Sequence, residues 1–247
     1  MKIKLFLSII LIAVLASACT LQIGDLEVQG IDPTGVQVTE VRPAQDFTRV
    51  VMAGVGRLEI TQGSEEKLVV EADEAFMPHL ITRVENGTLF LGETKPGTIF
   101  TNMENITYTL TVKTLEGISL SGLGDVQAKP LTAERMEIQV SGSGNVEIED
   151  LQAETLTVQI SGLGSATVAG KVTRQEVSIS GSGDYDAPDL ESEEMTATIS
   201  GLGGMYVWVK TTLKATISGS GNITYFGSPT VTSDISGIGN LDPRGSK

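Results

Sequence analysis

The chain has very few of the residues on which most catalytic and metal sites depend. Its 247 residues include one cysteine, Cys19, and one histidine, His79. A single cysteine excludes a disulfide within the chain and a Cys-x-x-Cys metal or redox pair. A single histidine, which we expect at the surface, removes Ser-His-Asp and Cys-His catalysis in their ordinary forms. The sequence therefore predicts a protein that is not an enzyme and needs no cofactor.

Basic residues are also scarce. Lys and Arg number 17 against 31 Asp and Glu, which gives a formal net charge of −14 at pH 7. Since no basic cluster occurs anywhere, the sequence argues against nucleic-acid binding and against electrostatic docking onto anionic lipid. The many glycines never take the G-x-x-x-x-G-K order of a phosphate-binding loop.

Carboxylates are plentiful, so a calcium site and a glycosidase pair have to be weighed. The densest cluster contains Asp184, Asp186 and Asp189, but the D-x-D-x-D-G order of a calcium loop is absent. Two carboxylates can hydrolyse a glycosidic bond, yet the basic residues near the repeats are few and scattered. We therefore predict no metal. A β-helical polysaccharide-active enzyme is the less favoured alternative, which a cleft combining carboxylates with a basic residue would support.

The segment 1–18 has the features of a signal peptide. Lys2 and Lys4 precede an apolar run over residues 5–16, which is too short for a confident membrane span. Small residues lead directly into Cys19, as in a bacterial lipobox, so we expect Cys19 to be lipidated and to anchor the exported protein to the cell membrane or outer membrane. The alternative is ordinary cleavage with an incidental cysteine. Residues 19–46 then form a tether or, alternatively, contain a strand that caps the first coil.

One phrase, Ser-Gly-x-Gly, is written seven times at nearly constant intervals. A fixed period of roughly 20 residues indicates a stacked repeat architecture. The third letter alternates between a large apolar residue and serine, and the next letter is usually Asp or Asn. The copies begin at Ser121, Ser141, Ser161, Ser180, Ser200, Ser218 and Ser236.

Apolar residues alternate on both sides of each phrase, which is typical of half-buried strands. No helical period separates the copies. The sequence predicts an all-β fold, a single-stranded, right-handed parallel β-helix over positions 47–247, with regular repeats at 118–241. Each coil would then hold one repeat of about 18–20 residues. A coil of twice this length with two motifs is the alternative, but Ala and Val are too small to fill its cross-section.

The alternation also assigns directions within the motif. Counting by twos from Leu156 turns both glycines of the third copy inward and Leu163 outward. Inward glycines remove bulk where a coil bends or another backbone comes close. The glycines expected to have this structural role are Gly122, Gly124, Gly142, Gly144, Gly162, Gly164, Gly181, Gly183, Gly201, Gly203, Gly219, Gly221, Gly237 and Gly239.

Three sets of outward residues are candidates for surface contacts or for stacking. We expect an Asx ladder of amide hydrogen bonds along the rod, with left-handed backbone at a tight bend, from Asp125, Asn145, Asp184, Asn222 and Asn240. A row that collects calcium is the alternative for this set. An apolar stripe suited to self-association is expected from Leu123, Leu163, Leu202 and Ile238. A glycan or protein contact is expected from Tyr206 and Trp208, which could instead pack against a loop.

The motifs resemble a known family of bacterial surface proteins. The S-G-S-G-N/D phrases at Ser141, Ser180 and Ser218 are similar to those of the "putative auto-transporter adhesin head", or GIN, domain. Upstream segments agree over residues 47–50, 53–56, 58–63, 71–74 and 84–89, so that the similarity spans about residues 47–243. The resemblance implies a surface location and a β-helical fold, and it supplies no catalytic residues. The large apolar residue at alternate third positions departs from the family phrase.

The segment from residue 47 to 120 continues in strands with a blurred period. Asn86-Gly87, between two apolar runs, predicts a hairpin turn. A short helix is expected over residues 73–80, with Asp73 as its cap, and a loop over residues 93–103.

Two functional classes follow from the sequence. The first is a non-catalytic, adhesin-like surface module that binds a glycan or an envelope or host protein. The second is an envelope protein that associates with copies of itself, for which the exposed apolar stripe is the discriminating feature.

Overall fold

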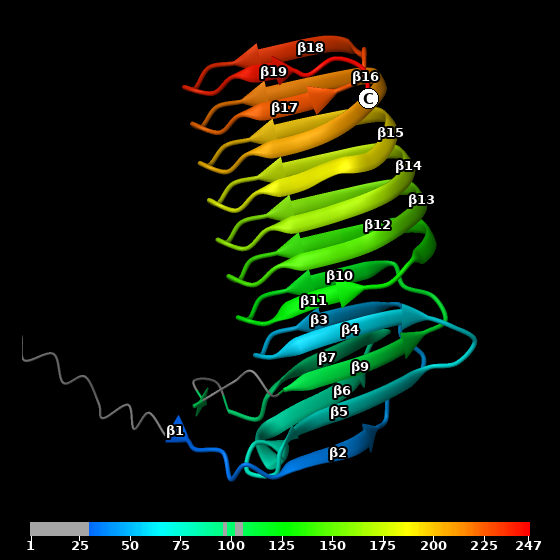
Figure 1. Cartoon of the computed structure of the whole chain (residues 1–247), viewed down its shortest axis with the longest axis vertical. Coiled ribbons are helices and arrows are strands. Elements are labelled where there is room, and N and C mark those ends of the chain that lie inside the picture. The colour runs from blue at the N-terminus through cyan, green and yellow to red at the C-terminus, as the bar shows by residue number, and fades with distance from the viewer. Residues whose placement is uncertain (1–29, 96–97, 102–105) are drawn as a thin grey trace, which may run out of the picture.

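The computed structural model of the chain describes residues 30–95, 98–101 and 106–247. Most of these residues lie in strands, and the strands stack into a rod (Figure 1). The expected signal peptide and Cys19 lie outside the described residues. Among the residues that are described, no helix is long and apolar enough to cross a membrane.

The regular part of the rod consists of strands that pair in parallel with the equivalent strand one repeat away. The registers join Glu137 to Thr157, Thr157 to Glu176 and Glu176 to Thr196. Each coil therefore contains one motif, which confirms the single-stranded parallel β-helix and rules out two motifs per coil. The strands are β12 (Leu131–Val140), β13 (Val146–Ile160), β14 (Ala166–Ile179), β15 (Tyr185–Ile199), β16 (Met205–Ile217), β17 (Ile223–Phe226), β18 (Thr230–Ile235) and β19 (Leu241–Pro243).

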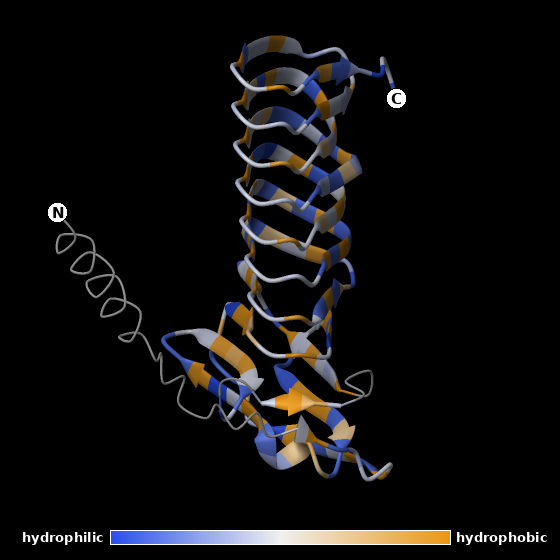
Figure 2. Cartoon of the chain, turned by 90° about the vertical axis from the view of Figure 1, so that its left-hand side faces the viewer, coloured by the Kyte–Doolittle hydropathy of each residue, from blue (hydrophilic) through white to orange (hydrophobic). Residues whose placement is uncertain are grey.

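Each coil has two faces and one sharp edge. One strand segment leads into the motif, the motif reverses the chain, and a second segment leads out, so that the motifs line one edge of the rod (Figure 2). We call these parts the pre-motif face, the motif edge and the post-motif face. Ile138 and Val140 come from the first face and Val146 and Ile148 from the second, and all four are buried. Since strand side chains alternate, the two faces share one core between them.

A hydrogen-bonded polar pair, Gln175 and Tyr185, interrupts this aliphatic core. Gln175 takes the position that Leu156 and Met195 occupy in the neighbouring coils. The hydroxyl of Tyr185 donates a hydrogen bond of 2.8 Å to Oε1 of Gln175, and both residues are fully buried. Burial also raises the pKa of Tyr185. Within the described part of the chain, Nε2 of Gln175 has no hydrogen-bond partner.

The coils at the N-terminal end do not follow the order of the sequence. The coil made of β3 (Arg49–Met52) and β4 (Arg57–Gln62) stacks on one side against β10 (Gly117–Leu120) and β11 (Asp125–Ala128). On its other side it stacks against β7 (Thr88–Glu93) and β9 (Thr107–Val112). The strands β7 and β9 therefore lie beneath β3 and β4, although they come later in the chain.

Antiparallel strands cover the N-terminal end of the rod. The tether expected from the sequence spans residues 19–46, of which residues 19–29 lie outside the described residues. Within the described part, residues 37–42 form a strand of this cover, which agrees with the alternative of a capping strand. The pairs are β2 (Gln37–Arg42) with β5 (Lys67–Asp73), β5 with β9, and β6 (Leu80–Glu85) with β7. A short parallel pair, β1 (Gly30–Ile31) with β8 (Ile99–Phe100), lies beside them.

Two local predictions for this region have different outcomes. Asn86 and Gly87 join β6 to β7 with φ angles of 51° and 72°, so the predicted hairpin turn is confirmed. The expected helix over residues 73–80 is wrong, because only one 3₁₀ turn forms, at Met77–His79. Asp73 instead accepts hydrogen bonds from the backbone N–H groups of Thr34, Gly35 and Ala75, and so ties the first described segment to β5.

Candidate binding surfaces

The motif glycines allow successive coils to approach each other at the motif edge. A Cβ atom on Gly142 would lie 2.0 Å from the carbonyl oxygen of Gly122, and one on Gly144 would lie 1.7 Å from that of Gly124. No side chain fits at these distances. The alternation in the sequence predicts that these glycines face the interior of their own coil. In the structure, the atom nearest to an added Cβ belongs instead to the backbone of the preceding coil. The degenerate phrase at residues 53–56 is part of the same column, since Gly122 stacks on Gly54 in the same way.

The Asx residues do form a row along the rod, but their main bonds differ from the expected amide ladder. Oδ1 of Asp125 accepts a hydrogen bond of 2.9 Å from the backbone N–H of Asn145, and Oδ1 of Asn145 accepts one of 3.3 Å from that of Ser165. The same contact runs from Ser165 to Asp184, from Asp184 to Gly204 and from Asn222 to Asn240. Of the described non-glycine residues only Asp46 and Asn86 have a positive φ, so the expected left-handed backbone in this row is wrong.

The side-chain oxygens of the Asx row therefore help to hold each coil against the next one. The described residues contain no group of three or more His, Cys, Asp or Glu side chains placed to hold a metal ion.

The outward residues of the motif edge form an apolar column. Leu123, Leu163, Leu202 and Ile238 are 63%, 68%, 68% and 85% exposed. Serines take the same position in the intervening coils. The apolar side chains therefore recur at every second coil, which spaces them roughly 9–10 Å apart.

A groove of about 710 Å³ runs along the pre-motif face. Its floor comes from five strands that are stacked in order, β3, β10, β12, β13 and β14, so it extends over roughly 19 Å of the rod. One column of the floor contains Val51, Ser119, Gln139, Gln159 and Ser178, which are neighbours in register. The second column contains Ser121, Ser141, Ser161 and Ser180, and Val140, Ile160 and Glu176 complete the lining.

The polar groups of this groove are available to a ligand. Gln159 and the groove serines take part in none of the side-chain hydrogen bonds that the described residues form. Gln139 donates only to Glu137, at 2.5 Å. The groove thus offers several hydroxyl and amide groups and one carboxylate, Glu176. Sequence reasoning missed this site because no strand contributes more than two polar residues to it, and β3 contributes none.

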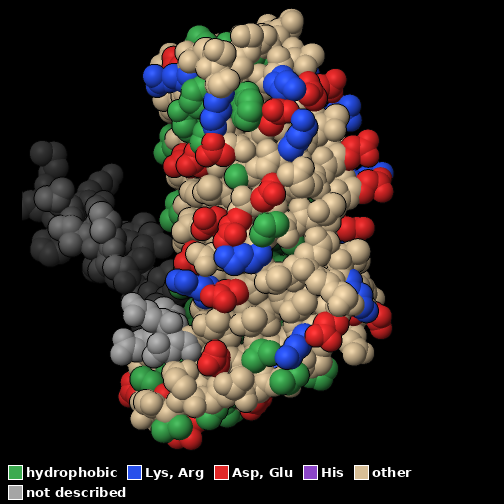
Figure 3. Space-filling model, turned by 45° about the vertical axis from the view of Figure 1, so that its right-hand side comes forward, with side chains coloured by type: hydrophobic (Ala, Val, Ile, Leu, Met, Phe, Trp, Pro, Cys, Tyr) green, Lys and Arg blue, Asp and Glu red, His purple; other side chains and the backbone are tan. Residues whose placement is uncertain are grey.

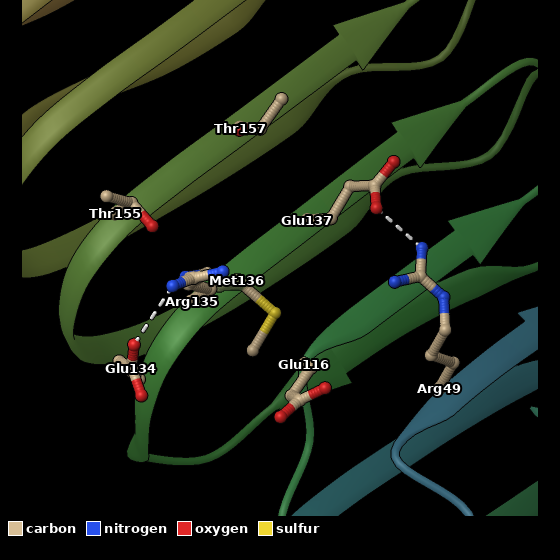
Figure 4. A pocket seen from close by; sticks show the side chains of 8 residues that line it. All are labelled: Arg49, Glu116, Glu134, Arg135, Met136, Glu137, Thr155 and Thr157. Carbon is tan, nitrogen blue, oxygen red and sulfur yellow. Dashed lines mark hydrogen bonds and ion pairs between the residues drawn. The ribbon is translucent and has the colours of Figure 1, made fainter. Parts of the chain in front are cut away.

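A second hollow, of about 540 Å³, lies on the same face but farther from the motif edge, and it is strongly charged (Figure 4). Arg49 reaches across from β3 to donate a hydrogen bond of 2.6 Å to Glu137, while Arg135 pairs with Glu134 at 3.2 Å. Glu116 lies between the two pairs.

This hollow brings carboxylates and basic residues together, as the enzyme alternative requires. The hydrogen bond from Arg49 holds the pKa of Glu137 below its usual value, although partial burial opposes the shift. A glycosidase needs a carboxylic acid whose pKa is raised, so that it can give a proton to the leaving group. The lowered pKa of Glu137 therefore fits a residue that joins two coils through an ion pair better than it fits an acid catalyst.

Aromatic side chains gather on the post-motif face toward the C-terminal end, where Figure 3 shows hydrophobic side chains among charged ones. Tyr206 is exposed and Trp208 is half-buried, with both side chains pointing outward as the alternation predicts. Sequence reasoning missed two partners. Phe226 is adjacent to Trp208 in register, and its ring centroid lies 5.2 Å from that of Tyr206. Lys247 lies over Trp208 and Phe226. The available signal was that Phe226 follows Trp208 by one repeat.

Comparisons with known proteins agree with this architecture. A family described as "Putative auto-transporter adhesin, head GIN domain" matches residues 46–229. A solved structure described as a "putative adhesin" from Bacteroides fragilis NCTC 9343 is 28% identical, with a TM-score of 0.83, and the match covers 87% of this chain and 100% of that one. A "putative lipid binding protein" from Parabacteroides distasonis ATCC 8503 is 26% identical, with a TM-score of 0.72 over 87% and 99% of the two chains.

A third structure, a "putative adhesin" from Parabacteroides merdae ATCC 43184, shares the fold at 23% identity, with a TM-score of 0.65 over 87% of this chain and 98% of that one. No curated protein matches the chain. The family match covers most of the chain, and the motif that carries it builds the stacked edge of the rod. The chain therefore belongs to the family of adhesin-head GIN domains.

Proposed function

We propose that the protein is an exported, lipid-anchored and non-catalytic adhesin-like module that binds an uncharged carbohydrate along the groove of the pre-motif face. The observation that carries this proposal is the groove itself, in which four successive coils contribute serine or glutamine side chains and the coil of β3 contributes Val51. The family description and the neighbouring structures support a surface role.

The chemistry of the groove favours a polyhydroxylated ligand. Hydroxyl and amide groups both donate and accept hydrogen bonds, as sugar hydroxyls do. Glu176 and the overall charge of −14 disfavour an anionic ligand. A serine of the second column recurs once in each of four successive coils, so an elongated polymer lying along the rod would meet an equivalent hydroxyl group in each of them.

If the groove is the binding site, substitutions in it should weaken glycan binding, whereas substitutions outside it should not. Replacing Gln139 and Gln159 together by alanine should weaken binding to a neutral glycan by roughly tenfold, because two hydrogen bonds to an uncharged ligand are lost. A glycan array would identify the ligand, and calorimetry would measure the change. Thr198→Ala with Thr216→Ala is the matched control, because these residues continue the same column beyond the groove. Equal affinity of all three proteins would remove the groove as the binding site.

The anchor has a separate test. Cys19→Ser should move the protein from the membrane fraction to the soluble or secreted fraction, because the thiol that accepts the lipid is gone. Cell fractionation with mass spectrometry of the N-terminal peptide measures both location and lipid. A mutant that stays on the membrane, or a wild-type protein without lipid, would contradict the lipoprotein assignment.

Self-association in the cell envelope is the second candidate, and the exposed apolar column favours it. If copies of the protein pair through this column, the wild type should sediment as an oligomer. Replacing Leu123, Leu163 and Leu202 by serine should then return it to a monomer. Ser143→Ala with Ser182→Ala is the control at the same edge. A monomeric wild type at high concentration would exclude this candidate.

A further inference from the structure

Lys247 is held on an aromatic surface of the post-motif face. Its Nζ lies 5.3 Å from the ring centroid of Trp208 and 5.5 Å from that of Phe226. Trp208 and Phe226 are adjacent in register on β16 and β17, so two stacked coils present both rings to the same cation. An ammonium group at this distance is attracted by the electron-rich face of an aromatic ring.

Polar groups complete the surroundings of this ammonium. Nζ of Lys247 donates a hydrogen bond of 2.5 Å to the carbonyl oxygen of Pro188, and it forms an ion pair with the carboxylate of Asp189. The side chain of Lys247 is only 31% exposed, whereas that of Asp189 is 73% exposed. Two rings, a carbonyl and a carboxylate therefore converge on one point at the surface.

The neighbouring charges also suit a cation. Asp186 lies beside Tyr206 in register, and Glu191 and Glu193 follow Asp189 on the same strand. Lys210 pairs with Glu191 and Glu193. Lys171 also pairs with Glu191, which leaves Asp186 and Asp189 to set the local field. The net charge of −14 adds a long-range attraction for basic proteins.

The segment that carries Lys247 has few attachments. Arg244 donates a backbone hydrogen bond to Tyr225, and Gly227 donates one to Gly245, each of 2.8 Å. Beyond Gly245 the described backbone shows no further hydrogen bond between the chain and the rod. Lys247 can therefore leave the rings without the loss of any coil-to-coil pairing.

We propose that Trp208, Phe226, Asp189 and the Pro188 carbonyl form a receptor site for a lysine side chain, which Lys247 fills in cis and a lysine of a partner protein fills after displacing it. A primary ammonium fits because the site accepts N–H hydrogen bonds, which a quaternary ammonium cannot donate. The inference names a class of protein partner for the proposed binding module, and its biological use rests on that function. It concerns a face opposite the groove, so the two sites can be tested separately.

Fluorescence reports on this site directly, because Trp208 is the only tryptophan of the chain. The probe is Nα-acetyl-lysine amide, titrated into the full protein in a non-ionic detergent. We expect Lys247→Ala to bind it with millimolar affinity and a shift of the Trp208 emission. The wild type should bind roughly five- to tenfold more weakly, because its own lysine occupies the site. Adding Asp189→Asn to Lys247→Ala should weaken binding by roughly tenfold, because an ionic hydrogen bond is lost.

Two controls decide the assignment. Sodium chloride at equal ionic strength should leave the emission unchanged, and tetramethylammonium should bind at least several-fold more weakly than the lysine derivative. No response of Lys247→Ala to the lysine derivative, or an equal response to tetramethylammonium, would overturn the proposal. Lys247→Gln gives the same test with a longer side chain if the alanine variant is unstable. Glycan binding and membrane anchoring should be unchanged in all these variants, so a failure here is distinguishable from a failure of the proposed function.

Discussion

Gly144→Ala is expected to lower the free energy of unfolding by about 3 kcal/mol or more, at the upper end of the usual cost of overpacking. The new Cβ would lie 1.7 Å from the carbonyl oxygen of Gly124 and 2.7 Å from its carbon. Both are backbone atoms of the preceding coil, so no rotamer change relieves the contact. The two coils have to separate, with loss of the hydrogen bonds between them. Denaturant unfolding measures the change.

Two matched variants show whether the contact itself is responsible. Ser143→Ala lies in the same turn, but its side chain is exposed, so the free energy should change by no more than about 0.5 kcal/mol. Leu163→Ser, at the outward position one coil on, should also cost little. Repeat proteins can open locally, so hydrogen exchange should show the loss of protection concentrated around the mutated coil. Equal melting of Gly144→Ala and the wild type would contradict the stacking role of the motif glycines.

Tyr185→Phe is expected to cost about 1–3 kcal/mol, because it leaves a buried amide without its only partner. In the wild type the Tyr185 hydroxyl donates to Oε1 of Gln175, and within the described structure Nε2 of the same amide is already unpaired. The single variant removes one hydroxyl and leaves the whole buried amide unsatisfied. Thermal or chemical denaturation measures the difference.

The double variant Gln175→Leu with Tyr185→Phe should recover the loss and equal or exceed the stability of the wild type. Leucine already occupies this core position one coil earlier, at Leu156, so its size is compatible with the site. Replacing both members of a buried polar pair by apolar groups is often neutral or stabilising. A double variant that is less stable than Tyr185→Phe alone would show that Gln175 contributes more than its bond to the tyrosine.

The regular rod was predictable because its information is local and repeated. The spacing from one motif to the next matches the stacking registers, such as Thr157 with Glu176. Alternation within each strand placed Leu163 and Tyr206 at the surface. The Asn86-Gly87 turn was also predictable. A two-residue hairpin turn of this kind requires positive φ at both central residues, and Asn-Gly is a residue pair that adopts it readily.

Features that depend on the contact between coils were not predictable in the same way. The sequence indicated which positions form the Asx row, but only the stacked structure shows that their oxygens accept backbone N–H groups of the next coil. Gln175 lies at an inward position, yet its partner Tyr185 lies on the next strand and is recognised only from the packed core.

The groove and the lysine site depend on register to an even greater degree. Gln139 and Gln159 become neighbours because one coil separates them, and Trp208 and Phe226 meet for the same reason.

The sequence by itself determined the β-helix and the outward direction of the apolar column, because both follow from a period that every copy repeats. The Leu/Ser alternation left one or two motifs per coil open, and the stacking registers decided for one. The tertiary structure alone decided the order of coils at the N-terminal end, where β7 and β9 stack beneath β3 and β4. The physical reason is that parallel stacking requires only matched registers and complementary cores. Several strands of this irregular segment have sequences that satisfy both conditions, so the sequence does not select one stacking partner. The antiparallel cover formed by β2, β5 and β6 then determines which coil lies at the end of the rod. The cover pairs with the free side of β7 and β9. The strands β10 and β11 can therefore stack only on the other side of β3 and β4.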